Sequence, residues 1–223
     1  MKDNFKKLIE AAKKSLENPG HSPRPLPKKE SEKFSVIYVF RHTETYDNRR
    51  RVFSGRRNTR LTPRGIKQAK QLAKKLKGKR IDLAYCPPLI RCKWTLREVL
   101  RYHPGVKIIV DPLLVERDYG ELTGKSKLKL MRENFELAVK YRRGYDFPPP
   151  GGESFKDVQT KRIFPFCRRL EKELSKTKKN VAICCTNNTM RLIRMYFEKL
   201  TIFQMQTLEN PFGDYAAYVV KPH

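Results

Sequence analysis

Several features common in other classes of protein are missing from this chain of 223 residues. No apolar run approaches the ~18 residues that a membrane-spanning helix needs, and the N-terminus is charged where a secretory signal would be apolar. The five cysteines form no CxxC pair and are too sparse for a disulfide scaffold. Cysteines and histidines do not cluster at metal-ligand spacing either. We therefore expect a cytoplasmic protein with reduced, buried cysteines and no bound metal.

Acidic residues are also scarce, since 23 Asp and Glu stand against 50 Lys and Arg, giving a formal net charge of +27. Residues 1–33 carry nine Lys/Arg and five Asp/Glu, a balance of +4, so most of the charge belongs to the rest of the chain. This charge favours an anionic partner: a phosphorylated small molecule, nucleic acid or acidic membrane. No nucleic-acid module is recognisable, so the last two rest on charge only. The oligomeric state, including a homo-oligomer, stays open.

The N-terminal segment differs in pattern from the rest. Residues 1–17 predict a basic amphipathic helix, because apolar side chains recur at helical spacing and lysines fill the other face. The apolar positions are Phe5, Leu8, Ile9, Ala12 and Leu16. Residues 18–33 are rich in proline and predict an extended linker. We therefore divide the chain into this helix and linker, residues 1–33, and one domain, residues 34–223. The helix is expected to dock on that domain or to be partly disordered, and pairing with a partner or contact with a membrane are the alternatives.

From residue 35 onward, predicted strands alternate with helices. Strands are expected at 35–40, 81–85, 106–110, 181–185 and 215–220, and helices at 62–76, 89–102, 127–144, 154–176 and 188–199. The 154–176 helix should be interrupted at Pro165. This alternation predicts an α/β fold, a three-layer sandwich with a mostly parallel central sheet and helices on both faces.

Candidate catalytic groups follow the predicted strands. Arg41 and His42 end the first strand, and open α/β sheets bind ligands at the carboxyl ends of their strands. A histidine alone there is most often structural, but the adjacent guanidinium group matches phosphate geometry. Residues 49–65 add an arginine-rich loop, and Arg91 follows the second strand. Glu116, after the third, is a candidate proton shuttle.

Seven motifs then occur in the order found in the histidine phosphatase superfamily. They are RHTET, FSGRRNTRLTPRG, the helix of Arg91, ERDYG, YRRGYDFPPP, GGES and CTNNTMR. Over residues 35–220 the chain resembles the cofactor-dependent phosphoglycerate mutase branch in particular, through FSG after the first motif, ERDYG and YRRGYD. The resemblance implies a glycolytic phosphotransferase that uses a phosphohistidine, primed by 2,3-bisphosphoglycerate without a metal, on a small anionic phosphoester such as phosphoglycerate.

The resemblance also implies a role for each matching residue. His42 is the expected nucleophile, Arg41 and Arg91 are the expected clamps on the phosphoryl group, and Glu116 is the expected general acid and base. Phosphoryl transfer depends mainly on positioning and preorganised positive charge, which suits this set. The positions expected to contact the substrate or its phosphoryl group are Asn48, Ser54, Gly55, Tyr119, Lys127, Arg142, Arg143, Asn187 and Asn188.

The chain departs from the family pattern at two positions. Thr186 stands where the family has its second histidine, and Thr43 replaces the glycine after the first. We expect both threonines in the tightest part of the pocket, with the Thr186 hydroxyl donating to a phosphoryl oxygen. Losing one preorganised donor costs ~10²–10³ in rate, so a slowed enzyme is expected. His103 and His223 are the candidates for replacing the missing histidine. A phosphatase and a phosphate-binding pseudoenzyme remain the alternatives.

Overall fold

A computed structural model describes residues 2–17 and 24–222. Its α-helices are α1 (Lys2–Glu17), α2 (Tyr46–Arg49), α3 (Pro63–Leu76), α4 (Ile90–Val99), α5 (Lys127–Glu133), α6 (Phe135–Arg143), α7 (Phe155–Val158), α8 (Phe164–Leu174), α9 (Asn187–Glu198) and α10 (Ile202–Thr207). The strands are β1 (Ser35–Arg41), β2 (Leu83–Cys86), β3 (Lys107–Val110), β4 (Val181–Cys185) and β5 (Tyr215–Val220). The remaining described elements are three short 3-10 helices and one π-helical turn. The 3-10 helices are η1 (Leu100–Tyr102), η2 (Pro112–Leu114) and η3 (Gly120–Leu122), and the π-helical turn is η4 (Gln159–Ile163).

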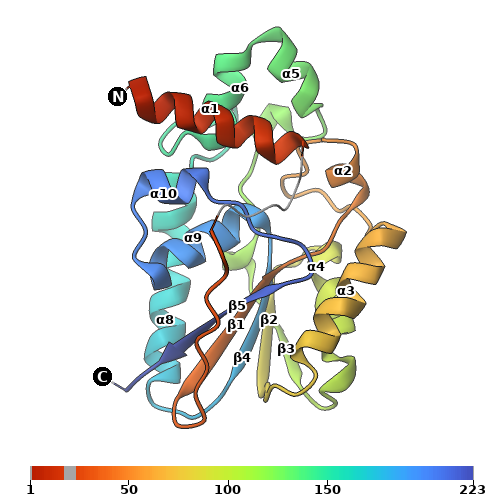
Figure 1. The fold of residues 1–223 in the computed structure, drawn as a ribbon, viewed down its shortest axis with the longest axis vertical. Helices are drawn as coiled ribbons and strands as arrows, with labels where there is room; N and C mark the ends of the chain where they lie inside the picture. The colour runs from red at the N-terminus through yellow and green to blue at the C-terminus, as the bar shows by residue number, and fades with distance from the viewer. Residues whose placement is uncertain (1, 18–23, 223) are drawn as a thin grey trace.

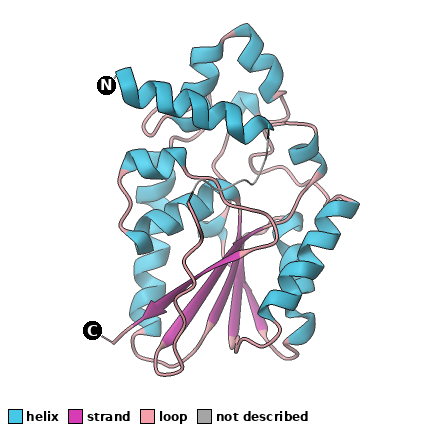
Figure 2. Cartoon of the chain, viewed as in Figure 1, coloured by secondary structure: helices cyan, strands magenta, loops and turns pink. Residues whose placement is uncertain are grey.

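The strands form one central sheet with helices on both sides (Figure 1, Figure 2). Their order is β3-β2-β4-β1-β5, and every neighbouring pair is parallel except β1 and β5. Helices α3 and α4 cover one face and α8 and α9 cover the other. The predicted fold class, a mostly parallel sheet between two helical layers, is confirmed.

Strand β1 is buried on both faces and leads directly to the candidate nucleophile. Ile37 and Val39 pack in the core beneath α8 and α9, whereas Phe40 packs with residues of α3 and α4. Arg41 pairs with Cys185, the last residue of β4, and the His42 N–H donates to the Cys185 carbonyl at 2.9 Å. The loops after β1 and β4 therefore start side by side at the carboxyl edge of the sheet.

Two predicted helices differ in detail from the observed ones. The helix expected over 127–144 is two helices, because Asn134 adopts an extended conformation and caps α6 through its side chain. Pro165 does not end the helix expected over 154–176. The chain stays helical through α7, η4 and α8, and the wide π turn immediately precedes the proline. A proline lacks an N–H and crowds the preceding turn, so a locally wider helix accommodates it.

The N-terminal segment packs against the domain. Helix α1 forms as its apolar spacing predicts, and it lies across α6 and α10 (Figure 1). Part of the predicted linker, residues 18–23, lies outside the described residues. The rest follows the edge strand β5: the Pro27 carbonyl accepts from Ala217 N at 2.8 Å, and Lys29 N donates to the Ala217 carbonyl at 3.1 Å. An edge strand offers unpaired backbone groups, which explains why this stretch is held there and not extended freely.

Candidate active site

His42 is presented as a neutral imidazole with one nitrogen free. Its Nδ1 lies 2.8 Å from the Thr43 carbonyl oxygen, which only accepts, so the proton is on Nδ1 and Nε2 keeps its lone pair. Burial lowers the pKa of His42 well below its ordinary value, and the charges of Arg91 and Arg41 lower it further. An unprotonated, oriented imidazole of this kind is a nucleophile at neutral pH.

Two buried guanidinium groups flank this histidine. Arg91 donates to the Gly55 and Arg57 carbonyls, both at 2.8 Å, and Arg41 donates to the Asn210 carbonyl at 3.2 Å. The Nε of each arginine is buried and has no hydrogen-bond partner among the described residues. Burial lowers the pKa of Arg41 to about 10, so it stays charged at neutral pH. Buried donors left without an acceptor are expected at a site that binds an anion.

These groups line one strongly cationic cavity of about 90 Å³. The charged side chains among the described residues that line it are the cations Arg41, Arg51, Arg91, Lys127, Arg142, Arg143 and Arg191 and the carboxylates Glu116 and Glu209. Counted formally, with every Lys and Arg charged and His42 neutral, seven positive and two negative charges leave +5. A cavity of this size and charge suits a phosphoryl group.

The structure brings nearly all the predicted site residues together here. The cavity lining includes Arg41, His42, Asn48, Ser54, Gly55, Arg91, Glu116, Tyr119, Lys127, Arg142, Arg143, Asn187 and Asn188. Oε1 of Glu116 accepts from Arg117 N at 2.8 Å, which fixes that carboxylate at the cavity wall. The Tyr119 hydroxyl accepts from Asn188 Nδ2 at 3.0 Å. Burial lowers the pKa of Lys127 to about 7, with Arg142 and Arg41 contributing.

Thr186 is the predicted site residue that does not line the cavity. Its hydroxyl donates to Thr189 Oγ1 at 2.9 Å, and Thr189 in turn reaches the Leu114 carbonyl at 3.3 Å. Thr43 is likewise buried outside the lining, with its hydroxyl 3.4 Å from that of Thr95. The expectation that both threonines enter the pocket is therefore corrected: each short side chain is held by a hydroxyl partner in the core.

No other described histidine takes the place of the missing one. His103 follows η1 and is not among the residues that line the cavity. His223 lies outside the described residues. The wall that begins at Thr186 is instead formed by the first turn of α9, where Asn187 and Asn188 line the cavity. A helix N-terminus carries partial positive charge, which favours a bound anion.

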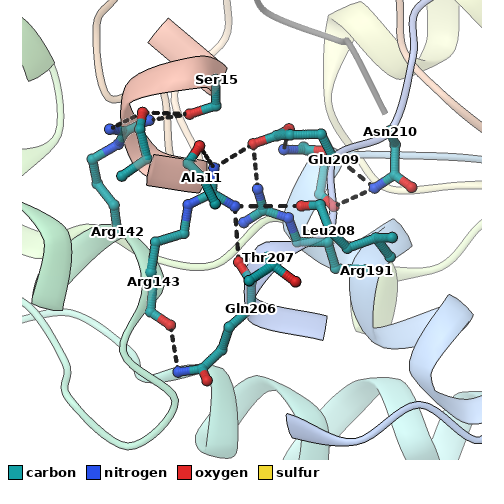
Figure 3. A network of polar contacts seen from close by, with 12 residues as sticks. Ala11, Ser15, Arg142, Arg143, Arg191, Gln206, Thr207, Leu208, Glu209 and Asn210 are labelled. Carbon is teal, nitrogen blue, oxygen red and sulfur yellow. Dashed lines mark hydrogen bonds and ion pairs between the residues drawn. The ribbon is translucent and has the colours of Figure 1, made fainter. Parts of the chain in front are cut away.

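Glu209 and Arg191 line the cavity but were missed by the sequence prediction. Glu209 Oε1 accepts from Arg143 at 2.6 Å and from Arg191 at 2.5 Å, and its Oε2 accepts from Asn187 at 2.8 Å (Figure 3). Arg191 lies one helical turn beyond Asn187 and Asn188, so helical spacing could have placed it on the same wall. No local pattern marks Glu209, because it follows α10 in a loop.

Helix α1 also reaches this site, which was not expected from the sequence. Ser15 and Leu16 line the cavity. Arg142 donates to the Ala12 carbonyl at 3.1 Å and to the Ser15 hydroxyl at 2.7 Å (Figure 3). Arg51 donates to the Leu16 carbonyl at 2.7 Å. The last turns of α1 thus contact arginines of the cavity wall.

The described part of the chain holds neither a metal-binding group nor a membrane-spanning helix. Among residues 2–17 and 24–222, no three His, Cys, Asp or Glu side chains gather where they could hold a metal ion. No helix within the same residues is both long and apolar enough to cross a membrane.

The fold and this cavity define an α/β protein with a buried neutral histidine among guanidinium groups, and comparison with known proteins identifies its family. A profile of the histidine phosphatase superfamily (branch 1) matches residues 37–221. A 2,3-bisphosphoglycerate-dependent phosphoglycerate mutase of Brucella melitensis is 34% identical over 183 residues, 80% of this chain and 88% of that protein. The chain belongs to the histidine phosphatase superfamily, as its motifs predict.

Solved structures of the same fold include phosphatases. A putative α-ribazole-5′-phosphate phosphatase from Escherichia coli has a TM-score of 0.73 at 26% identity, over 82% of this chain and 89% of that chain. A mycobacterial glucosyl-3-phosphoglycerate phosphatase shares the fold with a TM-score of 0.71 at 19% identity, over 85% of this chain and 99% of its own. The chain is thus similar in sequence to a protein named as a mutase and in fold to proteins named as phosphatases.

Proposed function

We propose that this protein is a phosphotransferase that takes the phosphoryl group of a small anionic phosphomonoester onto Nε2 of His42. The observation that carries the proposal is the neutral His42, with Nδ1 bound to a backbone carbonyl and Nε2 free, in a cavity lined by the buried Arg41 and Arg91. Their free Nε donors, together with Ser54 and the first turn of α9, would hold the phosphoryl oxygens.

The reaction follows from these positions. The lone pair of Nε2 forms the N–P bond while the ester O–P bond breaks, and Glu116, which enters this step as the protonated acid, gives its proton to the leaving oxygen and becomes a carboxylate. Glu116 then removes a proton from the acceptor hydroxyl or water as that oxygen attacks the phosphohistidine, which restores His42. The residues of the domain 34–223 would carry the chemistry, with α1 and residues 24–33 packed on it.

A mutase is the form that the sequence relatives support. In that form 2,3-bisphosphoglycerate would prime His42, and a second hydroxyl of the substrate would accept the phosphoryl group. The 34% identity to a protein named as a mutase and the position of Lys127 in the cavity favour it. Tyr119, Arg142 and Arg143 would then hold the substrate's carboxylate and second phosphate.

A phosphatase differs only in the acceptor, which is water. The 26%-identical phosphatase structure favours this form. So does the pairing of Arg143 with Glu209, because a phosphatase does not require that arginine to hold a second anionic group. A phosphate-binding pseudoenzyme is the outcome if no transfer occurs, and the absence of Thr186 from the cavity lining is the observation in its favour.

The test is transfer of label to the protein from radioactive 2,3-bisphosphoglycerate and, in parallel, from radioactive glycerol 3-phosphate, whose phosphate is its only anionic group. We expect an acid-labile phosphoprotein in the wild type, none in His42→Ala, and unchanged labelling in His103→Ala, which lies outside the cavity. Lack of labelling of the wild type from both donors, or equal labelling of His42→Ala, would refute the proposal. Conversion of 3-phosphoglycerate to 2-phosphoglycerate, followed together with release of free phosphate, then separates mutase from phosphatase.

A further inference from the structure

The wall of the cavity already contains an anion that belongs to the protein. Glu209 is buried, and both of its carboxylate oxygens are bound, to Arg143, Arg191 and Asn187 (Figure 3). Burial alone raises the pKa of Glu209, but the charges of Arg191 and Arg143 outweigh it and hold the pKa well below its usual value. The carboxylate is therefore a permanent negative charge at neutral pH.

Helix α1 supplies further acceptors to Arg143 and to its neighbour Arg142. Arg143 donates to the Ala11 carbonyl at 3.1 Å as well as to Glu209, and Arg142 binds the Ala12 carbonyl and the Ser15 hydroxyl (Figure 3). These groups belong to the last two turns of α1, and a helix carries partial negative charge at its C-terminal end. Both arginines of the pair thus have acceptors from within the chain.

The guanidinium groups of the cavity therefore differ in what they offer a ligand. The Nε donors of Arg41 and Arg91, which flank the nucleophilic histidine, are buried and unpartnered within the described residues. Arg191 also has an unpartnered Nε among those residues, but its Nη2 binds Glu209, and both terminal nitrogens of Arg143 already bind acceptors of the protein. A second anionic group would have to displace Glu209 from these two arginines or lie beside its carboxylate. Like charges in a buried site repel strongly.

We propose that Glu209, with the last turns of α1, takes the place of a second substrate anion, so that the cavity selects phosphomonoesters whose phosphoryl group is the only anionic group. This inference rests on the proposed phosphoryl site at His42 and names its substrate class. Glu209 acts here as a specificity-determining residue, and the selectivity favours water as the acceptor over a phosphoglycerate hydroxyl.

The test compares two ligands that differ in one group. Glycerol 3-phosphate and 3-phosphoglycerate share a three-carbon phosphomonoester, but the second carries a carboxylate where the first has a hydroxymethyl group. Calorimetry on the full chain with His42→Ala, which prevents turnover, gives both dissociation constants. We expect glycerol 3-phosphate to bind at least tenfold more tightly.

Glu209→Gln keeps the shape of the side chain and removes its charge. We expect it to shift the ratio of the two affinities at least tenfold toward 3-phosphoglycerate. Glu116→Gln is the matched control, because it removes the same charge from the same cavity without touching Arg143 or Arg191. It should strengthen both ligands alike and leave the ratio unchanged.

Tighter binding of 3-phosphoglycerate by the protein with Glu209 intact would overturn the inference, and that comparison needs no folded Glu209 variant. An unchanged ratio in a folded Glu209→Gln protein would overturn it as well. Failure of the proposed function shows itself separately, as absence of His42-dependent labelling from glycerol 3-phosphate as well as from 2,3-bisphosphoglycerate, because these affinities are measured without phosphoryl transfer.

Discussion

At the scale of single residues, the contacts of His42 set the state in which it reacts. The Thr43 carbonyl fixes the tautomer, and burial beside Arg41 and Arg91 keeps the ring neutral. A protonated imidazole would place a third positive charge against two guanidinium groups, so protonation is disfavoured. The same arginines that would bind the phosphoryl group thus also keep its acceptor unprotonated.

The first prediction concerns the pH dependence of His42 phosphorylation. Because the pKa is lowered, the ring stays neutral as pH falls through 6.5, the ordinary value, and is protonated only at lower pH. The labelling rate should therefore stay flat through pH 6.5 and decline well below it. Rapid-quench measurements from pH 4.5 to 8 test this. Arg91→Gln should move the decline to higher pH, whereas Arg97→Gln, exposed on the same helix, should not. A decline centred at pH 6.5 in the wild type would contradict it.

The residues of the site illustrate what the sequence could and could not predict. The motifs predicted fourteen site residues, and all of them except Thr186 line the cavity. Residues that follow neighbouring parallel strands meet at one edge of a sheet, which made a common site predictable. The orientation of Thr186 was not predictable, because it depends on Thr189 and the Leu114 carbonyl, a partner distant in sequence. The position of Glu209 in the arginine cluster depends on a loop without a motif.

At the scale of elements, the site depends on close contacts between loops. Gly120 follows Tyr119 at φ +51°, and a Cβ placed on it would lie 2.1 Å from the Pro150 carbonyl oxygen. The turn at 148–152 therefore packs directly on the backbone that carries Tyr119. Gly105 has a similar conformation, with φ +81°, but no atom lies within 4 Å of its Cβ position.

The second prediction uses this pair of glycines. Gly105→Ala should cost about 1–2 kcal/mol of unfolding free energy, the usual cost of a left-handed conformation for a residue with a Cβ. Gly120→Ala should cost about 1–3 kcal/mol more, because backbone on both sides must shift. Urea unfolding of the two variants gives the difference. Equal losses would show that the two loops separate easily.

The third prediction concerns the docking of α1. Ala12 is fully buried in that contact, whereas Lys14 on the same helix is exposed. Ala12→Leu should overpack the contact at a cost of about 1–3 kcal/mol. Amide exchange in α1 should become about fivefold to a hundredfold faster, since ~1.4 kcal/mol is a factor of ten. Lys14→Leu, a control that introduces the same side chain, should change it little.

Loosening α1 should also affect the cavity. Arg142 and Arg143 would lose their α1 carbonyl acceptors, so we expect inorganic phosphate to bind more tightly to Ala12→Leu than to the wild type. Faster exchange with unchanged phosphate affinity would show that α1 does not compete for these arginines. The sequence predicted the helix and its apolar face, but the arginines that it contacts are distant in sequence and needed the fold.

At the scale of the whole molecule, charges on the surface and charges in the cavity differ in how strongly salt screens them. The formal net charge is +27, whereas the cavity accounts for +5. Surface charges are screened over about 8 Å at physiological salt, and buried ones much less. Charge on the surface would therefore attract anions generally, whereas charge in the cavity would act on an anion that fits there.

The last prediction separates these two contributions by ionic strength. Phosphate affinity should fall severalfold as salt first rises and then level off, because the buried contacts of Arg41 and Arg91 are poorly screened. Binding of a single-stranded oligonucleotide should instead fall steadily on a double-logarithmic plot, since it depends on counterion release. Replacing the exposed Lys67, Lys70 and Lys74 with Gln should weaken the initial fall and leave the plateau unchanged. If phosphate binding kept falling as the oligonucleotide does, the phosphate would be held by the surface, and the buried guanidinium groups would not be its site.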